Sequence, residues 1–427
     1  MKRNRTALLV LVILFAIGAA ACSSGGGNNG EGSSGGSNGK KVDVVWWFPA
    51  KEQEAAMKQI ADNFNKKQDK INLKVQLNAG ADYYTKLQTT LAAKNGPDIM
   101  WMNGPNFPKF QSKGFLLKYD ELIERDGFSM ADFPDALVKL YSKDGVYGMP
   151  KDYDTIGLFY NKELFDKAGV PYPTEKWTWE DLRNAAKKLT IGSGDKTTQW
   201  GIAVPASTQE VIYPFFVQNG VKPMSDDRTS LQYDSPEGIE AIQFLYDLMY
   251  KDKSSPDGQY MTDNDPTQLF QSGKVAMIMN GSWMAKPYYD VLKDKVDVQF
   301  MPIEKTKGNI IHGVAWVANA NTKHKDETWE VIKYLGSKEV AMLQADSGTV
   351  IPALKGTQDA WVKALPMNLK IFTESAEFAT PYPTAFDPEW ETTVATHLTN
   401  IWLNKESPAD GMKKVTEEAN ALLSAAK

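Results

Sequence analysis

The chain of 427 residues contains a single cysteine, Cys22, and only three histidines. A disulfide bond within the chain is therefore impossible, and no cluster of cysteines can form around a metal ion. The histidines, His312, His324 and His397, do not have the spacing of metal ligands, and the K-H-K-D run around His324 is typical of a solvated surface. We therefore expect neither a metal site nor a cofactor.

Positive charge is not in excess either. The chain has 48 Lys and Arg residues against 53 Asp and Glu residues, and its formal net charge of −5 argues against a nucleic acid as partner. It contains no H-E-x-x-H motif and no P-loop, and no G-x-S-x-G elbow follows a predicted strand. Carboxylates are plentiful, so a retaining glycosidase stays open, because it needs only two of them about 5–5.5 Å apart across a cleft.

The longest apolar run is too short to span a membrane. Ala7–Ala21 contains 15 residues, whereas a transmembrane helix needs roughly 20. The basic start M-K-R-N-R precedes it, so residues 1–21 are predicted to be a signal peptide. The run ends in G-A-A-A-C, which is similar to a lipobox with Cys22 as the acylated residue, although Ala19 stands where the commonest pattern has leucine. The alternative is an ordinary cleavage site beside an incidental cysteine.

Residues 22–40 are predicted to be the lipidated cysteine followed by a flexible linker rich in Gly and Ser. The linker has a root-mean-square reach of roughly 23 Å. It would keep the folded part close to a membrane surface but free to tumble. We therefore expect a lipid-anchored protein on the extracellular face of the cytoplasmic membrane, as in Gram-positive bacteria.

From residue 41 onward, strands and helices are predicted to alternate. Val42–Phe48 is expected to be a buried strand, and the helix after it places Met57, Ile60 and Phe64 on one face. A strand over residues 71–77, a helix that ends at Gly96 and a strand over residues 97–102 follow. This β-α-β-α-β order implies parallel strands with right-handed crossovers, and hence an α/β fold.

The stretch Val146–Leu182 is the most informative part of the chain. It is predicted as a short strand, a corner at Pro150, an acidic and aromatic tip K-D-Y-D and a second strand over Thr155–Tyr160. Its pattern M-P-x-x-x-D-x-x-x-L-x-Y-N-x-x-L-F-x-x-A-G resembles a hallmark of the extracellular sugar-binding proteins of bacterial ABC importers. The resemblance extends over most of the mature chain.

Capping residues predict several further element boundaries. The expected helix starts carry Asn161, Thr178 with Asp181, and Ser235 with Pro236, and two expected helix ends carry Gly169 and Gly273. An apolar strand over Val275–Met279 leads into an N-G-S-W loop, and a final helix begins at about Ser407.

The resemblance implies a two-lobed, periplasmic-binding-protein-like α/β fold of type II, with parallel-sheet lobes joined by crossover hinge segments. The implied first lobe comprises residues 41–152 plus 317–365, and the second comprises residues 156–312 plus 366–427. The crossovers would lie near residues 153–155, 312–316 and 365–380. In the family, the chain leaves the first lobe and enters the second within the K-D-Y-D region.

Ligands of open α/β sheets bind beyond the carboxyl ends of the strands, so the loops that follow the strands are the expected binding region. These loops, at residues 46–53, 101–107, 151–154, 205–210, 280–283 and 346–352, repeatedly contain Trp, Tyr, Asn, Asp and Gln. A sugar needs that mixture, because its C–H face stacks on an aromatic ring and its hydroxyl groups bond to amides and carboxylates.

The resemblance assigns the leading role to Trp283, since the matching tryptophan of the family lies against a sugar ring. The alternative is a tryptophan buried under the loop. Asp154 corresponds to the acidic residue that meets sugar hydroxyls in maltose-binding relatives, and its alternative is a hinge carboxylate that caps a backbone N–H. Lys51 follows Ala50 where maltose binders have an Asp–Lys pair, which argues against maltodextrin as the ligand.

The remaining candidate residues occupy the same set of loops. The loop after residue 100 has Pro105 where the maltose binders have an acidic residue further along, so Asn103 takes the polar role there. Glu210 and Tyr382 fall in segments that carry ligand contacts in the family. The complete set of expected ligand-binding residues is Trp283, Asp154, Asn103, Trp101, Tyr153, Trp47, Lys51, Glu210 and Tyr382.

These expectations combine into a membrane-tethered receptor, a monomer, that captures a sugar between two lobes. The sugar is expected to be an oligosaccharide, and the partners are the permease subunits of an ABC transporter. Two alternatives stay open. A polyamine receptor would also use aromatic rings with carboxylates, and a secreted glycoside hydrolase would use paired carboxylates.

Overall fold

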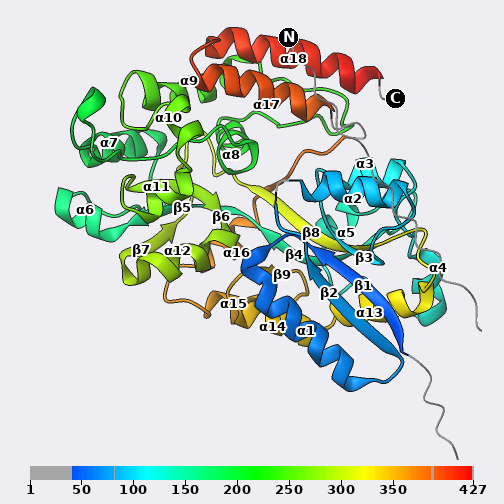
Figure 1. The fold of residues 1–427 in the computed structure, drawn as a ribbon. Coiled ribbons are helices and arrows are strands. Elements are labelled where there is room, and N and C mark those ends of the chain that lie inside the picture. Colours follow the sequence, from blue (N-terminus) through cyan, green and yellow to red (C-terminus); the bar gives the residue numbers. More distant parts are fainter. Residues whose placement is uncertain (1–40, 81, 386–388, 426–427) are drawn as a thin grey trace, which may run out of the picture. The chain divides into compact units, whose positions relative to one another are not determined.

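Two separate β-sheets organise the part of the chain that the computed structural model describes, residues 41–425 without residue 81 and residues 386–388. The predicted signal peptide, Cys22 and the linker lie outside these residues. The first sheet has the order β2-β1-β3-β8-β4-β9, with β10 paired to β8, and the second has the order β6-β5-β7 (Figure 1).

The strand boundaries agree closely with the predicted ones in the first half of the chain. The first sheet contains β1 (Val42–Phe48), β2 (Ile71–Leu77), β3 (Ile99–Asn103), β4 (Gly148–Asp154), β8 (Ile310–Ala318), β9 (Ile351–Pro352) and β10 (Thr380–Pro381). The second sheet contains β5 (Ile156–Asn161), β6 (Met277–Gly281) and β7 (Val296–Gln299).

Parallel pairing is confirmed where the β-α-β pattern predicted it, and the short strand β10 also pairs in parallel with β8. β1 pairs in parallel with β2 and with β3. β8 runs antiparallel to β3 and β4, and both pairs of the second sheet are antiparallel, so the expectation of two parallel-sheet lobes is wrong. The physical reason is the route of the chain, because β8 returns to the first sheet from the second one and no helical crossover joins it to β3 or β4.

The K-D-Y-D segment also differs from its prediction as a tip between two strands. Residues 151–154 continue β4 and are buried. Pro150 lies opposite Ala315 and Asp152 lies opposite Val314, so Lys151 is an extra residue in β4. Such a bulge interrupts the regular pairing and lets the strand continue past a proline that has no N–H to donate.

The chain passes from β4 to β5 through a single residue, Thr155. Its hydroxyl donates to the carbonyl oxygen of Phe372 at 2.8 Å. Asn309 fastens the first residue of β5, since its Oδ1 accepts from the backbone N–H of Ile156 at 2.9 Å and its Nδ2 donates to the carbonyl oxygen of Ile156 at 2.7 Å. The backbone N–H of Thr380 donates to the carbonyl oxygen of Asn309 at 2.9 Å. Three segments that connect the two sheets therefore meet around Asn309.

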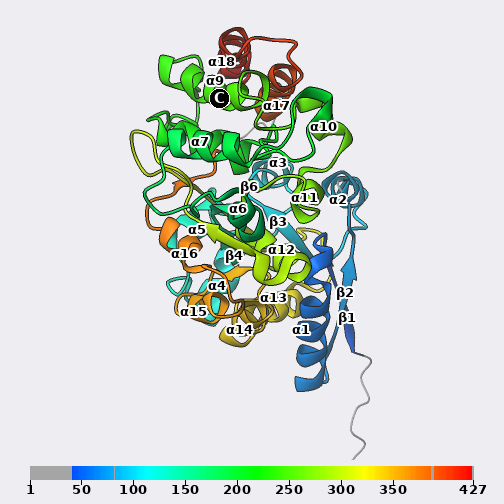
Figure 2. The same cartoon turned by 90° about the vertical axis from the view of Figure 1, so that its left-hand side faces the viewer.

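Helices cover both sheets. Those near the first sheet are α1 (Glu54–Lys67), α2 (Tyr83–Ala92), α3 (Phe107–Ser112), α4 (Asp120–Asp126), α5 (Asp135–Leu140), α13 (Lys325–Leu335), α14 (Lys338–Asp346) and α15 (Gln358–Val362). Those near the second are α6 (Lys162–Ala168), α7 (Trp179–Leu189), α8 (Tyr213–Gln218), α9 (Pro236–Tyr250), α10 (Gly258–Asp263), α11 (Pro266–Gln271), α12 (Ala285–Leu292), α16 (Lys370–Ser375), α17 (Glu389–Trp402) and α18 (Pro408–Ala425). Figure 2 shows α9, α17 and α18 together at one end and α1, α13 and α14 at the other.

The predicted helix caps are present. Asn161 accepts from the N–H of Leu164, Thr178 and Asp181 form a capping box, and Ser235 accepts from the N–H of Gly238. None of the helices among the described residues is long and apolar enough to cross a membrane.

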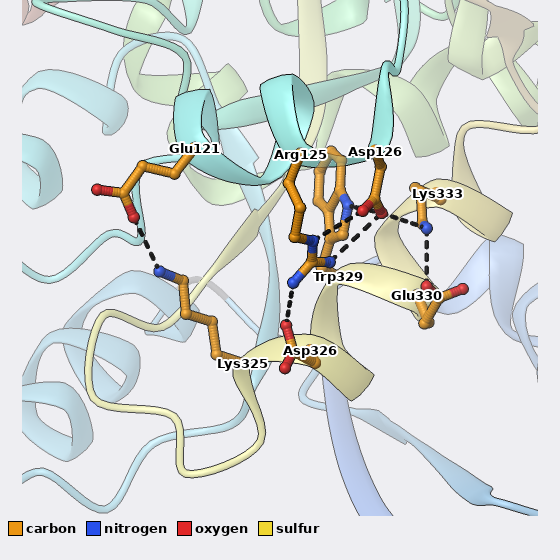
Figure 3. A network of polar contacts seen from close by, with 8 residues as sticks. All are labelled: Glu121, Arg125, Asp126, Lys325, Asp326, Trp329, Glu330 and Lys333. Atoms are coloured by element: carbon orange, nitrogen blue, oxygen red, sulfur yellow. Dashed lines mark hydrogen bonds and ion pairs between the residues drawn. The ribbon is translucent and has the colours of Figure 1, made fainter.

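A network of charged side chains ties α4 to α13 (Figure 3). The carboxylate of Asp126 accepts from Arg125 Nε at 2.7 Å, from Trp329 Nε1 at 2.9 Å and from Lys333 Nζ at 2.6 Å. Arg125 also donates to Asp326 at 2.5 Å, across the two helices. The network therefore fixes α13 in place on the first sheet, where the buried ring of Trp329 packs against Tyr119.

Candidate functional site

A cavity of about 220 Å³ lies where the ends of strands from both sheets meet. The first sheet contributes residues from β3, β4 and β8, and the second sheet contributes the turn that follows β6. The lining residues are Glu52, Gln53, Trp101, Asn103, Asp152, Tyr153, Asp154, Gln209, Ser282, Trp283, His312, Val314 and Val350. The cavity therefore lies in the region expected for a ligand, beyond the carboxyl ends of strands such as β3 and β6.

Two tryptophans from different sheets line this cavity. Trp101, in β3, is 9% exposed, and its ring packs edge-on against that of Trp316 with the centroids 5.7 Å apart. Trp283 lies in the short turn Ser282–Met284 after β6 and is partly buried. Its six-membered ring folds back over Gly281, where a Cβ would stand only 1.9 Å from the ring. Glycine is therefore required at that position for this placement of Trp283.

Asp154 joins the two halves of the cavity through side-chain hydrogen bonds. Its Oδ1 accepts from Gln209 Nε2 at 2.7 Å, and its Oδ2 lies 3.2 Å from His312 Nδ1. His312 Nε2 accepts from the backbone N–H of Gly104 at 3.2 Å, so the proton of the ring is on Nδ1 and is donated to Asp154. Both partners of Asp154 are side chains, which does not fit the alternative in which Asp154 caps a backbone N–H.

The cavity wall is acidic and rich in amide groups. It contains three carboxylates, from Glu52, Asp152 and Asp154, and no lysine or arginine. The Oε1 atom of Gln53, which is buried, has no hydrogen-bond partner within the described structure. Carboxylates and amides of this kind accept hydrogen bonds from the hydroxyl groups of a ligand, and the unpaired Gln53 oxygen has free capacity for one.

Five of the nine residues expected to bind ligand line the cavity: Trp101, Asn103, Tyr153, Asp154 and Trp283. Glu210 and Tyr382 lie close behind it. The hydroxyl group of Tyr382 is 3.3 Å from Thr208 Oγ1, and the ring of Tyr382 packs edge-on against His312. Glu210 follows Gln209 in the chain, and burial raises the pKa of its carboxyl group to about 7. Both residues therefore flank Gln209 and His312 without lining the cavity.

The other two expected residues lie away from the cavity. Trp47 donates from Nε1 to Gln76 at 2.7 Å, and the ammonium group of Lys86 lies 5.0 Å from the centroid of its ring. Lys51 is exposed. Trp46 is the fully buried member of the Trp46–Trp47 pair.

Sequence reasoning missed eight lining residues: Glu52, Gln53, Asp152, Gln209, Ser282, His312, Val314 and Val350. Most of them lie in the loops that were expected to carry the site. The rule that ligands bind beyond the carboxyl ends of strands therefore located these loops but did not show which of their residues line the cavity. His312 and Val314 lie within β8, and the pairing of β8 with β3 and β4 brings them there. No group of three or more potential metal ligands occurs among the described residues.

The model of the bacterial extracellular solute-binding protein family matches residues 49–342, more than half of the chain. The chain belongs to this family. Its members bind solutes, so this solute-binding protein is a receptor and not an enzyme.

The sequence identity to individual relatives is low. An arabinooligosaccharide-binding protein of Halalkalibacterium halodurans is 28% identical over 265 residues, which cover 59% of this chain and only 57% of that protein. A galactooligosaccharide-binding protein of Bacillus subtilis is 23% identical over 398 residues, which cover 90% of this chain and 89% of that protein.

Among solved structures, an ABC substrate-binding protein of Listeria monocytogenes in complex with cycloalternan is similar, with a TM-score of 0.84 and 26% identity. The superposition covers 90% of this chain and 99% of that one. The periplasmic-binding-protein fold that the resemblance implied is thereby confirmed, although its first sheet is mixed and its second sheet is antiparallel.

Proposed function

We propose that this solute-binding protein is a lipid-anchored extracellular receptor that binds an oligosaccharide in the cavity and delivers it to the permease of an ABC transporter. The observation that carries the proposal is the pairing of Trp101 and Trp283 with the amides and carboxylates of the same cavity. Aromatic rings hold the C–H face of a sugar and amides or carboxylates hold its hydroxyl groups.

The ligands for which the similar proteins are named support the same class of ligand, an oligosaccharide. Arabinooligosaccharides, galactooligosaccharides and cycloalternan differ in their units, but all are oligosaccharides. The cavity of about 220 Å³ is below the range of about 300–1,000 Å³ that is usual for small-molecule sites. An oligosaccharide would therefore either extend beyond the cavity or require the two sheets to move apart.

The proposed mechanism is closure of two lobes around the sugar, without covalent chemistry. The lobes would be residues 41–152 plus 317–365 and residues 156–312 plus 366–427. Within each lobe, the proposed ligand contacts are those that line the cavity, with Asp154 at the passage from β4 to β5. Permease subunits and the membrane are the proposed partners, and the receptor is proposed to act as a monomer.

A ligand panel tests this function. We expect arabino-, galacto- and gluco-oligosaccharides to be separated by thermal shift, because a ligand that binds only the native state stabilises it by RT ln(1 + [L]/Kd). Isothermal titration calorimetry then measures the dissociation constant of the best sugar. Spermidine serves as the comparison for the polyamine alternative. A shift with spermidine and with none of the oligosaccharides would reverse the assignment of the ligand class.

A further inference from the structure

Lys151 lies directly behind the wall of the cavity, and its side chain is completely buried. It is the extra residue of the bulge in β4, next to the lining residues Asp152 and Tyr153. A bulge changes the direction in which neighbouring side chains point and is common beside functional sites. Here it places a lysine in the interior, next to two residues that line the cavity.

Three groups surround the ammonium of Lys151. The carboxylate of Asp152 forms an ion pair and a hydrogen bond with it. The ring centroids of Trp101 and Trp316 lie 4.4 Å and 5.7 Å from its Nζ. Asp152 and Trp101 both line the cavity, and Trp316 packs against Trp101. One buried charge therefore contacts a carboxylate and an aromatic ring of the proposed sugar site at the same time.

Lys151 is also the positive charge that faces the acidic wall. Burial lowers the pKa of Lys151, and the negative charges of Asp152, Glu52 and Asp154 oppose that shift. Burial likewise raises the pKa of Asp152, and the charge of Lys151 opposes it. Each partner therefore counteracts the effect of burial on the other, inside a site whose lining contains no lysine or arginine.

We propose that Lys151 is a positioning residue and a buried counter-charge, which holds Trp101 and Asp152 in place and adapts the acidic site to uncharged sugars instead of cations. The proposal rests on the proposed function. Carboxylates beside aromatic rings are also what an organic cation needs. The ammonium group of Lys151 already contacts the carboxylate of Asp152 and the ring of Trp101 from behind the cavity wall. Part of the negative charge that would attract a cationic ligand is therefore neutralised.

Three variants separate positioning from charge: Lys151→Met, Asp152→Asn and the double variant Lys151→Met/Asp152→Asn. The probes are the neutral oligosaccharide that binds best in the panel and spermidine, each titrated by calorimetry. The melting temperature and the tryptophan fluorescence of every variant are measured in parallel, because Trp101 and Trp316 both contact Lys151.

Lys151→Met leaves Asp152 buried without its partner. We expect the neutral sugar to bind about 30-fold more weakly or worse, as when one member of a buried charge pair is removed. Spermidine should bind about tenfold more tightly, because the site gains one net negative charge close to the ligand. Asp152→Asn should weaken spermidine binding and sugar binding together.

The double variant removes both charges and restores the net charge of the parent. Its melting temperature should recover relative to Lys151→Met, because no unpaired charge is left buried. Spermidine affinity should return to that of the parent, whereas sugar affinity should stay low, since the carboxylate at position 152, a stronger acceptor than an amide, and the support of Trp101 are both missing. A residue with a purely structural role would regain sugar affinity along with stability.

The pair Arg183–Asp252 provides a matched control. Arg183 Nε lies 2.5 Å from Asp252 Oδ2, the two side chains are 17% and 5% exposed, and neither residue lines the cavity. Arg183→Met/Asp252→Asn should lower the melting temperature and leave both dissociation constants unchanged.

Two results would overturn the proposal. One is a folded Lys151→Met variant that binds the neutral sugar within about twofold of the parent, and the other is equal spermidine affinity in Lys151→Met and in the double variant. If the parent binds no oligosaccharide, the proposed function fails, and the spermidine titration and the fluorescence still decide whether Lys151 acts as the counter-charge.

Discussion

Trp283 is held in place by the residue two positions before it. Its ring lies over the backbone of Gly281, and the position accepts no Cβ. The turn that follows β6 can therefore present the ring at the cavity without burying it completely. A ring fixed in this way loses little conformational freedom when a sugar stacks on it, and this pre-organisation favours binding.

Replacement of Trp283 by alanine should weaken oligosaccharide binding far more than folding. A central aromatic contact contributes about 2–4 kcal/mol to binding, which corresponds to a dissociation constant about 30- to 1000-fold higher. Calorimetry with the best sugar and a thermal melt of the same variant measure the two effects. A large fall in melting temperature with unchanged affinity would instead identify Trp283 as a core residue.

Trp47→Ala is the matched control for this substitution. Trp47 is also partly exposed at the end of a strand, but its indole N–H bonds to Gln76 and its ring does not line the cavity. We expect it to bind the sugar as the parent does. Equal losses of affinity in both variants would show that a nonspecific effect, and not the cavity, explains the Trp283 result.

Single residues of the site could be predicted where the chain itself places them at the end of a strand. Asn103 ends β3, Trp101 lies two residues before it, and Trp283 follows β6, so the rule that ligands bind beyond strand ends, together with the family resemblance, selected them. His312 could not be predicted, because its role depends on the contact of β8 with β4, which are far apart in the sequence. The contact of Lys151 with Trp101 and Trp316 depends on the same long-range pairing.

At the scale of elements, α4 and α13 are fixed by charge as well as by packing (Figure 3). Hydrogen bonds from Arg125, Lys333 and Trp329 hold the pKa of Asp126 well below its usual range. A carboxylate whose pKa is lower in the folded state than in the unfolded state contributes stability at neutral pH. That contribution is lost as the pH falls through the range in which the carboxylate protonates.

Asp126→Asn should therefore lower the melting temperature at pH 7, and its difference from the parent should shrink from about pH 5 downward. Thermal melts at a series of pH values measure this difference. Glu121→Gln is the control, because the Glu121 side chain is 88% exposed and its contact with Lys325 spans 3.5 Å. A difference between Asp126→Asn and the parent that does not change with pH would contradict the role of the ionised carboxylate.

Several helix boundaries could be predicted from capping residues, whereas the pairing of β8 with β3 and β4 could not. The caps at Asn161, Thr178 and Ser235 act within a few residues, and each is present. The K-D-Y-D segment was predicted as a tip after a corner at Pro150, and both a proline and charged residues are unusual in a central strand. The bulge at Lys151 and the ion pair with Asp152 accommodate them there, and neither can be read from local pattern.

At the scale of the whole molecule, the predicted lipid anchor would decide where the receptor acts. Cys22 and the Gly/Ser-rich linker lie outside the described residues, so the lipid anchor remains a prediction from the sequence. Cys22→Ala should be released into the medium with the sugar affinity of the parent, because the substitution is far in sequence from the residues that line the cavity. Fractionation and immunoblotting measure the release, and a variant that stays in the membrane fraction would contradict the lipoprotein assignment.

The position of β8 also dictates an order of events in time. β8 lies between β3 and β4 in the first sheet, yet residues 155–309 separate it from β4 in the chain. As the polypeptide emerges from the membrane, β3 and β4 are available long before the strand that joins them. Until then both expose unpaired backbone groups, and such edges recruit other chains. The first sheet therefore begins to form before the second sheet but is completed after it. A chain interrupted before residue 310 is expected to aggregate instead of folding in part.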